Sequence, residues 1–309
     1  MNKFIKAGIA GLFLSLTATL ASCGGSSTSS TDSAAVTADV YPVTVGDLTL
    51  DAQPTSIISL SPTATEMLYA IGAGDQVVAV DEYSNYPAEA VALGTKLSGY
   101  EPNIEAISSY SPDLVIVSYD PGSLVEQLGT LNIPVFIAGA AMSLENVYEQ
   151  IEQLGILTGH SQAAIEVSKT LQSGIEEAIA SVKFNDPPLS YYYELDNTYY
   201  SVTSNTFIGQ IFNLFGMRNI ADNVEAGNDY PQLSAEVIVS ANPDFIFLAD
   251  TKCCAQDATT VAARDGWGGL KAVTANQVVA LDDDISSRWG PRVLDLITAI
   301  RDAVVAANS

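Results

Sequence analysis

The apolar residues of the first half of the chain fall into short β-branched runs separated by stretches with helical spacing. From Ser56 onward the runs are SIISLS, VVAV, LVIVS and VFIAG, and the helical stretches between them are TATEMLYAIG, IEAISSY and SLVEQLGTL. This alternation is typical of βαβ units, whose strands form a parallel sheet. Before it, YPVTVGDLTL alternates apolar and polar residues around Gly46-Asp47, which predicts a tight β-hairpin.

The strand pattern stops between Ser143 and about Lys183. Within this stretch the apolar residues keep helical spacing from Ser161 to Lys183, with Ser161 as the expected N-cap. At 1.5 Å per residue such a helix is about 30 Å long, which is enough to join two lobes. A long surface helix on a single domain is the alternative that the spacing leaves open.

The second half repeats the pattern of the first. Strand-like runs return as SYYYEL, FIFLA and VVALD, and a last helix is expected within RWGPRVLDLITAIRDAVVAA. The segment IEAISSYSPDLVIVSYD, residues 104–120, also has a relative in AEVIVSANPDFIFLAD, residues 235–250. We therefore predict an α/β fold of two lobes, each around a largely parallel sheet, with a cleft where the carboxyl ends of the strands face one another.

The repeat makes Glu105 and Glu236 matching residues. Each lies near the start of a short predicted helix, where the helix dipole favours a carboxylate. One interpretation is a local capping role. The other is a pair of surface carboxylates, one on each lobe, presented to a partner with correspondingly spaced basic sockets.

The N-terminus has the pattern of a lipoprotein signal peptide. Two lysines precede the apolar stretch AGIAGLFLSLTATLA, which ends in Leu20-Ala21-Ser22-Cys23 and is followed by GGSSTSSTDSAA. We expect a signal peptide at 1–22, a lipid on Cys23 and a flexible tether at 23–40. An ordinary signal peptide cut near Ala21 is the alternative. Either way, the folded part is predicted to lie outside the cytoplasm, and with the lipid it is anchored to the outer face of the cell membrane.

The charge balance bears on the partners. The chain has 36 acidic and 12 basic side chains and a formal net charge of −24, so nucleic acid is not expected to bind.

Export to an oxidising compartment affects how Cys253 and Cys254, which are adjacent in the sequence, are interpreted. A vicinal disulfide would need a strained eight-membered ring, and the sequence leaves this bond and two free thiols equally open. A metal site built from this pair alone is not expected.

Several ordered segments resemble one known family. They are PTSIISLSPTATEMLYAIGAGDQVVAVDEYSNYPAEA, IEAISSYSPDLVIVS, YPQLSAEVIVSANPDFIFLAD, GWGGLKAV and DDDISSRWGPRVLDL. Together they are similar to the periplasmic-binding-protein family that serves ABC importers of cobalamin, haem and ferric siderophores. The resemblance implies an N-terminal lobe at 41–160, a rigid connecting helix at 161–183 and a C-terminal lobe at 184–309. It also implies a monomer without a resident cofactor, in which Glu105 and Glu236 dock on arginines of a permease that works with ATPase subunits.

Within that family the chain looks closest to the cobalamin binders. Matching or neighbouring positions then imply a set of ligand contacts: Tyr83, Tyr100, Tyr119, Tyr200, Tyr230, Asp284 and Arg288. Tyr230 falls where those proteins carry a tryptophan, and Tyr200 falls at a phenylalanine. A second family tryptophan is replaced by the SGYEPN stretch, in which Tyr100 is the substitute, and a third corresponds to about Ser118, beside Tyr119. A phenol offers a flat face and a hydrogen-bonding tip, which suits a broad corrin ring rimmed with amides. Alternatively, the Asp282–Asp284 run terminates a strand and caps the last helix.

Other ligands and functions make different demands on the sequence. A ferric siderophore favours converging arginines, for which the candidates are Arg218, Arg264, Arg288 and Arg292, and haem needs an axial Tyr, His or Met. The single histidine, His160, is expected to have a local structural role, because a His-based metal site needs several. A Ser-His-Asp hydrolase would have to use His160, which lies at a helix entry, and no GxSxG elbow stands near a strand end, so an enzyme is not expected. An adhesive lipoprotein would leave the doubled lobes and the paired glutamates without a purpose.

Overall fold

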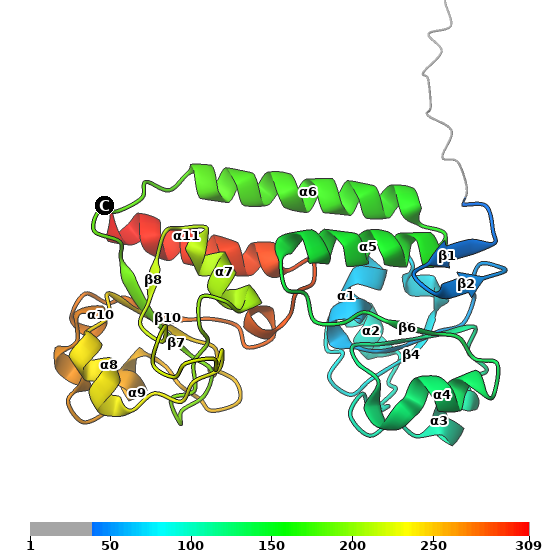
Figure 1. Cartoon of the computed structure of the whole chain (residues 1–309), viewed down its shortest axis with the longest axis horizontal. Coiled ribbons are helices and arrows are strands. Elements are labelled where there is room, and N and C mark those ends of the chain that lie inside the picture. Colours follow the sequence, from blue (N-terminus) through cyan, green and yellow to red (C-terminus); the bar gives the residue numbers. More distant parts are fainter. Residues whose placement is uncertain (1–38, 309) are drawn as a thin grey trace, which may run out of the picture. The chain divides into compact units, whose positions relative to one another are not determined.

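The structure is a computed structural model that describes residues 39–308 (Figure 1). The expected signal peptide, Cys23 and nearly all of the expected tether lie outside the described residues. The described part begins with the hairpin of β1 (Val43–Val45) and β2 (Leu48–Leu50), which pair antiparallel around Gly46 at φ +56°. The predicted hairpin is thereby confirmed, and its turn uses the backbone region that glycine enters most easily.

The first lobe is built on a four-stranded parallel sheet with the strand order β4–β3–β5–β6. Its strands are β3 (Ile57–Leu60), β4 (Val77–Val80), β5 (Leu114–Val117) and β6 (Val135–Ile137). Its helices are α1 (Pro62–Ala70), η1 (Gly74–Gln76), α2 (Ala88–Ala92), α3 (Ile104–Ser108), η2 (Pro121–Ser123) and α4 (Leu124–Gly129). Every residue of the two central strands, β3 and β5, is buried, which explains why they read as continuous apolar runs.

The second lobe is built on another four-stranded parallel sheet, with the order β10–β9–β7–β8. Its strands are β7 (Ser190–Glu194), β8 (Arg218–Asn219), β9 (Phe245–Leu248) and β10 (Val278–Ala280). Its helices are α7 (Phe207–Asn213), α8 (Ala235–Ala241), α9 (Ala258–Ala262), η3 (Trp267–Gly269), α10 (Lys271–Thr274) and η4 (Ile285–Ser287). The two-residue strand β8 was missed from the sequence, because so short a segment has no detectable periodicity.

The two sheets have the same strand order once corresponding strands are matched. β3 corresponds to β7, β4 to β8, β5 to β9 and β6 to β10, and every pairing within both sheets is parallel. The prediction that both halves are α/β units of similar construction is therefore confirmed at the level of topology.

The repeated Pro-Asp has a structural role in each sheet. Asp113 precedes β5, and its Oδ2 accepts hydrogen bonds from the backbone nitrogens of Thr55, at 2.8 Å, and Ser56, at 3.1 Å, just before β3. Asp244 precedes β9, and its Oδ2 accepts from the backbone nitrogen of Ser190, at 2.8 Å, at the start of β7. The amide of Thr55 contributes most to lowering the pKa of Asp113. In each lobe this aspartate ties the start of one central strand to the start of the other.

Three long helices lie along one side of both lobes: α5 (Leu144–Thr158), α6 (Ser161–Ala180) and α11 (Val293–Ala307). α6 packs against α5 of the first lobe and α11 of the second, and it extends over both in Figure 1. Ser161 is the first helical residue, so the prediction that it caps the helix was wrong. His160 occupies the cap position without a side-chain capping hydrogen bond, and the backbone nitrogen of Ser161 donates to Asp39 Oδ2 at 3.1 Å.

The largest apolar core is shared by the two lobes. It runs from α1 and α5 through the inner face of α6 to α11 and β7, and it includes Leu154, Leu171, Ile175, Tyr193 and Ile297. Smaller cores lie on the other face of each sheet. Because close-packed interiors resist deformation, this continuous core holds the two lobes at a fixed separation along their helical side.

Candidate functional site

Three tyrosines form an exposed aromatic cluster in the first lobe. Tyr83 follows β4, Tyr119 follows β5, and Tyr100 lies on the segment between α2 and α3. The rings of Tyr83 and Tyr100 meet edge to face with centroids 5.8 Å apart, and those of Tyr100 and Tyr119 are 6.5 Å apart. Their exposed fractions of 53%, 66% and 44% leave much of each ring accessible. The structure therefore brings together all three first-lobe tyrosines that the sequence indicated.

The two second-lobe tyrosines lie on neighbouring segments. Tyr200 pairs with Gln232 in an antiparallel bridge, and the backbone nitrogen of Ser201 donates to Pro231 O at 3.0 Å, which brings Tyr200 close in space to the segment of Tyr230. The two side chains are 40% and 57% exposed. Within residues 39–308, no ring contact joins these tyrosines to the first-lobe cluster.

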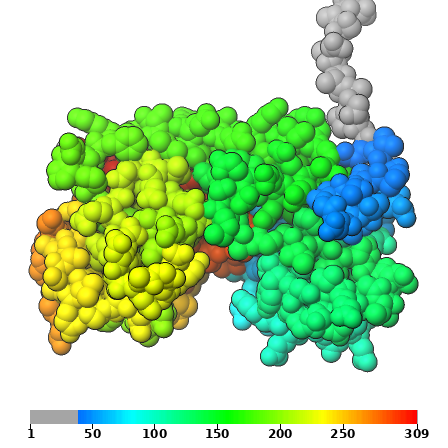
Figure 2. Space-filling model, in the orientation of Figure 1, coloured from blue at the N-terminus to red at the C-terminus, as the bar shows by residue number. Residues whose placement is uncertain are grey.

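A cavity of about 170 Å³ lies between the lobes, and Figure 2 shows the surface hollowed between them. The first lobe contributes Ala140, Ala141 and Met142, and the second contributes Tyr230, Arg288 and Trp289 among others. Met142 is 62% exposed and was not singled out from the sequence. Trp289 also lines this cavity, and its Nε1 donates to Gln150 Oε1 at 3.2 Å.

Arg288 has most of its hydrogen-bonding capacity satisfied within the protein. Its guanidinium donates to Glu66 Oε1 at 2.8 Å, Asn85 Oδ1 at 2.9 Å, the Tyr83 carbonyl at 3.0 Å and Asp284 Oδ1 at 2.9 Å. Three of these four acceptors belong to the first lobe, while Arg288 belongs to the segment that leads into α11. Arg288 therefore bridges the lobes at the wall of the cavity.

Glu66 is the acceptor at the centre of this bridge. It lies on α1, is 3% exposed, and accepts from Arg288 and also from Arg292, whose Nε and Nη2 lie 2.8 and 2.6 Å from its two oxygens. Buried carboxylates need such partners, since an unpaired charge in the interior is costly. The one sequence signal for Glu66 was its position as the lone acid in the apolar stretch TATEMLYAIG.

Asp284 joins the bridge to the exposed edge of the second lobe. Its Oδ2 accepts from Asn85 Nδ2 at 3.1 Å and from Lys252 Nζ at 2.6 Å. Lys252 also pairs with Asp282 at 2.7 Å, and Asp282 Oδ1 accepts from the backbone nitrogens of Asp284 and Ile285 where η4 begins. The cap position of the last helix, α11, is Arg292, so the expectation that the Asp282–Asp284 run caps that helix was wrong.

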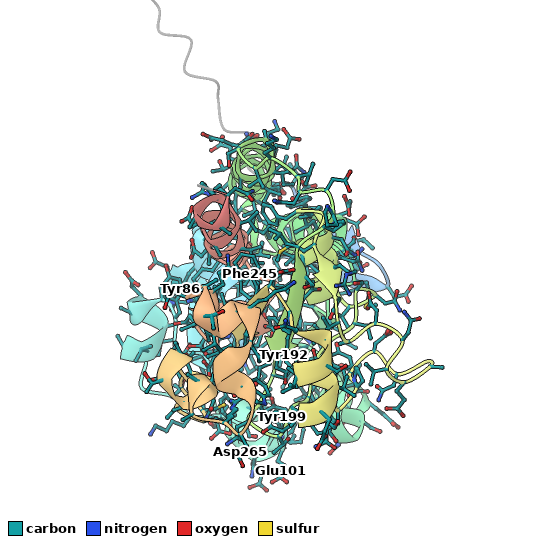
Figure 3. All side chains as sticks on the ribbon, turned by 90° about the vertical axis from the view of Figure 1, so that its left-hand side faces the viewer. Tyr86, Glu101, Tyr192, Tyr199, Phe245 and Asp265 are labelled. Carbon is teal, nitrogen blue, oxygen red and sulfur yellow. The ribbon has the colours of Figure 1, made fainter. Side chains whose placement is uncertain are left out.

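A second buried ion pair lies inside the second lobe. Arg264 binds Glu194 through two hydrogen bonds of 2.6 Å, and its guanidinium lies 4.6 Å from the centroid of the Trp267 ring. That ring stacks on Tyr199 at 5.6 Å, and Tyr199 is labelled in Figure 3. Arg264 was a candidate for binding an anionic siderophore. Because Glu194 binds both terminal nitrogens of its guanidinium, Arg264 has a structural role inside the lobe.

Asp250 is buried beside this pair. It is fully buried, and neither carboxylate oxygen has a hydrogen-bond partner within residues 39–308. Burial, followed by the negative charge of Glu194, raises the pKa of Asp250 to about 7. Two carboxylates cannot both ionise at close range without a cost, so a proton is retained here well above the usual pH range of an aspartic acid.

A larger cavity of about 890 Å³ lies elsewhere, between α1, α2 and the start of α11. Tyr69, Tyr86, Glu89, Arg292 and Asp295 are among its lining residues, and Arg292 lies 4.2 Å from the centroid of the Tyr86 ring. None of the ligand contacts expected from the sequence lines it. The larger of these two cavities is therefore not the one near the tyrosines and the strand ends. Open parallel sheets bind ligands at the carboxyl ends of their strands, which favours the smaller cavity between the lobes as the binding site.

Comparison with known proteins identifies the family. A model described as periplasmic binding protein matches residues 57–285. The chain belongs to the periplasmic binding protein family. It is 30% identical to an uncharacterised ABC transporter substrate-binding lipoprotein, YvrC, of Bacillus subtilis, over 97% of both chains. It is also 30% identical to a cobalamin-binding protein of Halobacterium salinarum (85% of this chain, 74% of that one) and 31% identical to a vitamin B12-binding protein of Vibrio parahaemolyticus (84% and 93%).

Solved structures agree with this assignment. The vitamin B12-binding protein BtuF of Vibrio cholerae superimposes with a TM-score of 0.67 at 28% identity, covering 83% of this chain and 98% of that one. The haem-binding protein RhuT of Roseiflexus superimposes with a TM-score of 0.72 at 23% identity, covering 82% and 99%, and supports the fold. The relatives found are binding proteins for transport and not enzymes.

In this periplasmic binding protein, Glu105 and Glu236 occupy equivalent positions. Each is the second residue of its helix, α3 or α8, after a capping residue: Asn103 Oδ1 accepts from Ala106 N at 2.9 Å, and Ser234 Oγ accepts from Val237 N at 3.3 Å. Both glutamates are exposed. In Figure 1, α3 and α8 lie at the ends of their lobes that point away from α6.

Within residues 39–308, no cluster of three or more His, Cys, Asp or Glu side chains is arranged to hold a metal ion. Within the same range, no helix combines the length and apolar character that crossing a bilayer requires. His160 Nδ1 lies 2.9 Å from the Thr158 carbonyl, which is a local contact.

Proposed function

We propose that this protein is the membrane-anchored substrate-binding lipoprotein of an ABC importer, and that it captures a corrinoid of the cobalamin type between its lobes. Relatives named as cobalamin-binding and vitamin B12-binding proteins, at 28–31% identity, support this ligand class. The lipobox at Cys23 supports anchoring on the extracytoplasmic face of the membrane.

The choice of ligand rests on one contrast. The tyrosines expected to contact the ligand are exposed, whereas the nearby basic side chains are already paired with carboxylates. Tyr83, Tyr100 and Tyr119 present ring faces and hydroxyls, whereas Arg288 and Lys252 are both held by carboxylates. A corrin ring is broad and rimmed with neutral amides, so it needs stacking surface and hydrogen bonds. Haem propionates and ferric siderophores carry anionic groups, for which free arginine forks are the preferred partners.

The cleft is favoured over the larger groove for the same chemical reason. The groove between α1 and α11 is lined by the carboxylates of Glu66, Asp75, Glu89 and Asp295, and its one arginine, Arg292, is bound to Glu66. In the cavity between the lobes the lining includes Tyr230, and in the first lobe the exposed Tyr83 and Tyr119 follow the carboxyl ends of β4 and β5, where we place the ligand. A large ligand that contacts both lobes at once also gives the transporter one composite surface to recognise.

Delivery is assigned to Glu105 and Glu236. Their carboxylates are exposed at matching positions on the two lobes, and the described structure provides no salt bridge for either. We infer that they dock on basic sockets of the permease, whose ATPase subunits supply the energy for release. Two fixed charges suit this purpose, since charge complementarity gives orientation and specificity more than raw affinity.

Equilibrium titration tests the ligand assignment. The purified protein is titrated separately with cyanocobalamin, haemin and a ferric hydroxamate, and binding is followed by protein fluorescence and the visible spectrum of each ligand. We expect saturable one-to-one binding of cyanocobalamin, with the ligand recovered chemically unchanged. Preferential binding of haemin or of the iron chelate would replace the corrinoid by another member of the same ligand group, and turnover of any of them would contradict a binding function.

A further inference from the structure

Cys253 and Cys254 lie on the turn that follows β9, at the edge of the second lobe. Their sulfur atoms are 2.7 Å apart, and both are present as thiols. A covalent S–S bond is about 2.05 Å long, so a small rotation of the two side chains would bring the sulfurs to bonding distance. Cys253 is exposed and Cys254 half-buried, so an oxidant can reach the pair from solvent.

The carboxylate of Asp283 holds the backbone of this turn. Its oxygens accept from the backbone nitrogens of Lys252, at 3.0 Å, and Cys253, at 2.9 Å, and from the Thr251 hydroxyl at 2.8 Å. Burial raises the pKa of Asp283, but the amides of Cys253 and Lys252 outweigh it and keep that pKa below its ordinary value. The conformation of the cysteine turn is therefore coupled to the Asp282–Asp284 segment.

That segment connects the turn to the first lobe. Lys252 Nζ binds Asp284 Oδ2 at 2.6 Å, and Asp284 in turn binds Arg288 and Asn85. Only one side chain, Asp284, thus separates the cysteine turn from the bridge between the lobes at the cavity wall.

We propose that Cys253 and Cys254 are oxidised to a vicinal disulfide in the exported protein, and that the ring fixes the turn on which the Asp283 and Lys252 contacts depend. The two thiols lose two protons and two electrons, and an oxidant bearing a disulfide, either a small-molecule disulfide or a thiol oxidoreductase of the envelope, is reduced to two thiols. The oxidising location follows from the proposed function as an exported lipoprotein.

The reactivity of the reduced pair bears on how it must be assayed. Burial, followed by the neighbouring Cys254, raises the pKa of the Cys253 thiol to about 12. Little Cys253 thiolate is then present at neutral pH, so alkylation of Cys253 in the folded reduced protein is slow and would be mistaken for a disulfide. Thiols must therefore be trapped after denaturation.

The decisive experiment is thiol trapping on the full chain exported by living cells. Cells are quenched in acid, the protein is denatured and alkylated, and the peptide that contains both cysteines is analysed by mass spectrometry with and without prior reduction. We expect no alkylation before reduction and two alkyl groups after it. In the C253S and C254S variants, the remaining thiol should be alkylated without reduction. Alkylation of both thiols in the unreduced wild type, or a bond that links two chains, would overturn the proposal.

The structural consequence is measured by hydrogen exchange on the oxidised and reduced proteins. The amides of Lys252 and Cys253 should exchange at least about tenfold faster after reduction, because local opening of the turn becomes easier. The temperature of global unfolding should change little, since the ring closes a very short loop. The amide of Ser190, held by Asp244 in the same sheet, is the matched control. Equal exchange in both states would remove the assigned role of the ring.

Ligand binding is assayed separately with cyanocobalamin on both redox forms. Failure to bind cyanocobalamin in either form would count against the proposed function and leave the trapping result intact. Binding together with two free thiols would count against the disulfide alone.

Discussion

Glu66 Oε1 accepts a hydrogen bond of 2.8 Å from Arg288, although 222 positions separate the two residues in the sequence. The same carboxylate also binds Arg292. One buried acid of the first lobe therefore binds two arginines of the segment that enters α11, and this cluster fastens the lobes together at the wall of the cavity between them.

Removal of this carboxylate charge should destabilise the protein. In E66Q, Arg288 and Arg292 lose a buried counter-charge, and we expect the free energy of unfolding to fall by about 3 kcal/mol. Urea denaturation followed by circular dichroism measures the change. E126Q, at an exposed position of α4, is the control and should change stability by less than about 0.5 kcal/mol. Equal stabilities of E66Q and E126Q would contradict the bridging role.

The central tyrosine of the first-lobe cluster should contribute to ligand binding through its ring. Tyr100 contacts both Tyr83 and Tyr119, so Y100A removes stacking surface and loosens its neighbours. We expect cyanocobalamin affinity to fall about tenfold in Y100A and less than about threefold in Y100F, which keeps the ring. Isothermal titration calorimetry measures both. Y110A, an exposed tyrosine beyond the C-terminus of α3, is the control, and a loss in Y110A as large as in Y100A would refute the assignment.

Charge reversal at the two docking glutamates should separate delivery from capture. In the E105R/E236R double variant, uptake of labelled cobalamin by cells should be abolished while affinity in solution stays within about twofold of the wild type, because neither residue lines the cavity between the lobes. The matched control is E166R/E177R, which reverses two exposed charges on α6. If the double variant lost affinity in parallel with uptake, or if the control abolished uptake as well, the docking role would be wrong.

The buried Asp250 should make stability depend on pH. Its pKa is raised from 3.8 to about 7 in the folded protein, so the folded state binds more protons than the unfolded state between about pH 4 and pH 7. The stabilising contribution is therefore complete below pH 4 and is lost as the pH rises through 7, by at most about 4 kcal/mol.

The variant D250N removes this titration, and its urea midpoint should fall less than that of the wild type between pH 5 and pH 8. D302N alters an exposed aspartate and serves as the control. Parallel pH profiles for the wild type and D250N would show that Asp250 does not titrate in this range.

Elements whose side chains face one environment along their length could be predicted from the sequence. The runs VVAV, LVIVS and FIFLA became β4, β5 and β9 because every position of the central strands β5 and β9, and all but one position of the edge strand β4, is buried. The hairpin followed from its alternation and its Gly-Asp turn. The helix α6 ends at Ala180 instead of Lys183, because its last residues carry too little apolar pattern to fix a boundary.

Features that depend on contacts far apart in the sequence could not be predicted in this way. Glu66 and Arg288 each follow an ordinary local pattern, and only the assembled fold shows that one binds the other. Met142 and Trp289 likewise line the cavity because two lobes meet there, which no local periodicity indicates. The paired glutamates could be predicted from the sequence because the repeat places each of them at the same distance before a Pro-Asp. Comparison of one half of the chain with the other therefore identifies them as matching residues.

The apolar core shared by α5, α6, α11 and β7 also limits how a guest can enter and leave. Two lobes with separate apolar cores can rotate apart through a large angle. Here the same rotation would disrupt a single packed core that both lobes share. The separation of the lobes is therefore fixed when the chain folds. Ligands are then discriminated by how well they fit the side chains of a cavity of nearly constant width. Under the proposed transport function, the energy that releases the ligand would therefore have to come from the permease and its ATPase subunits.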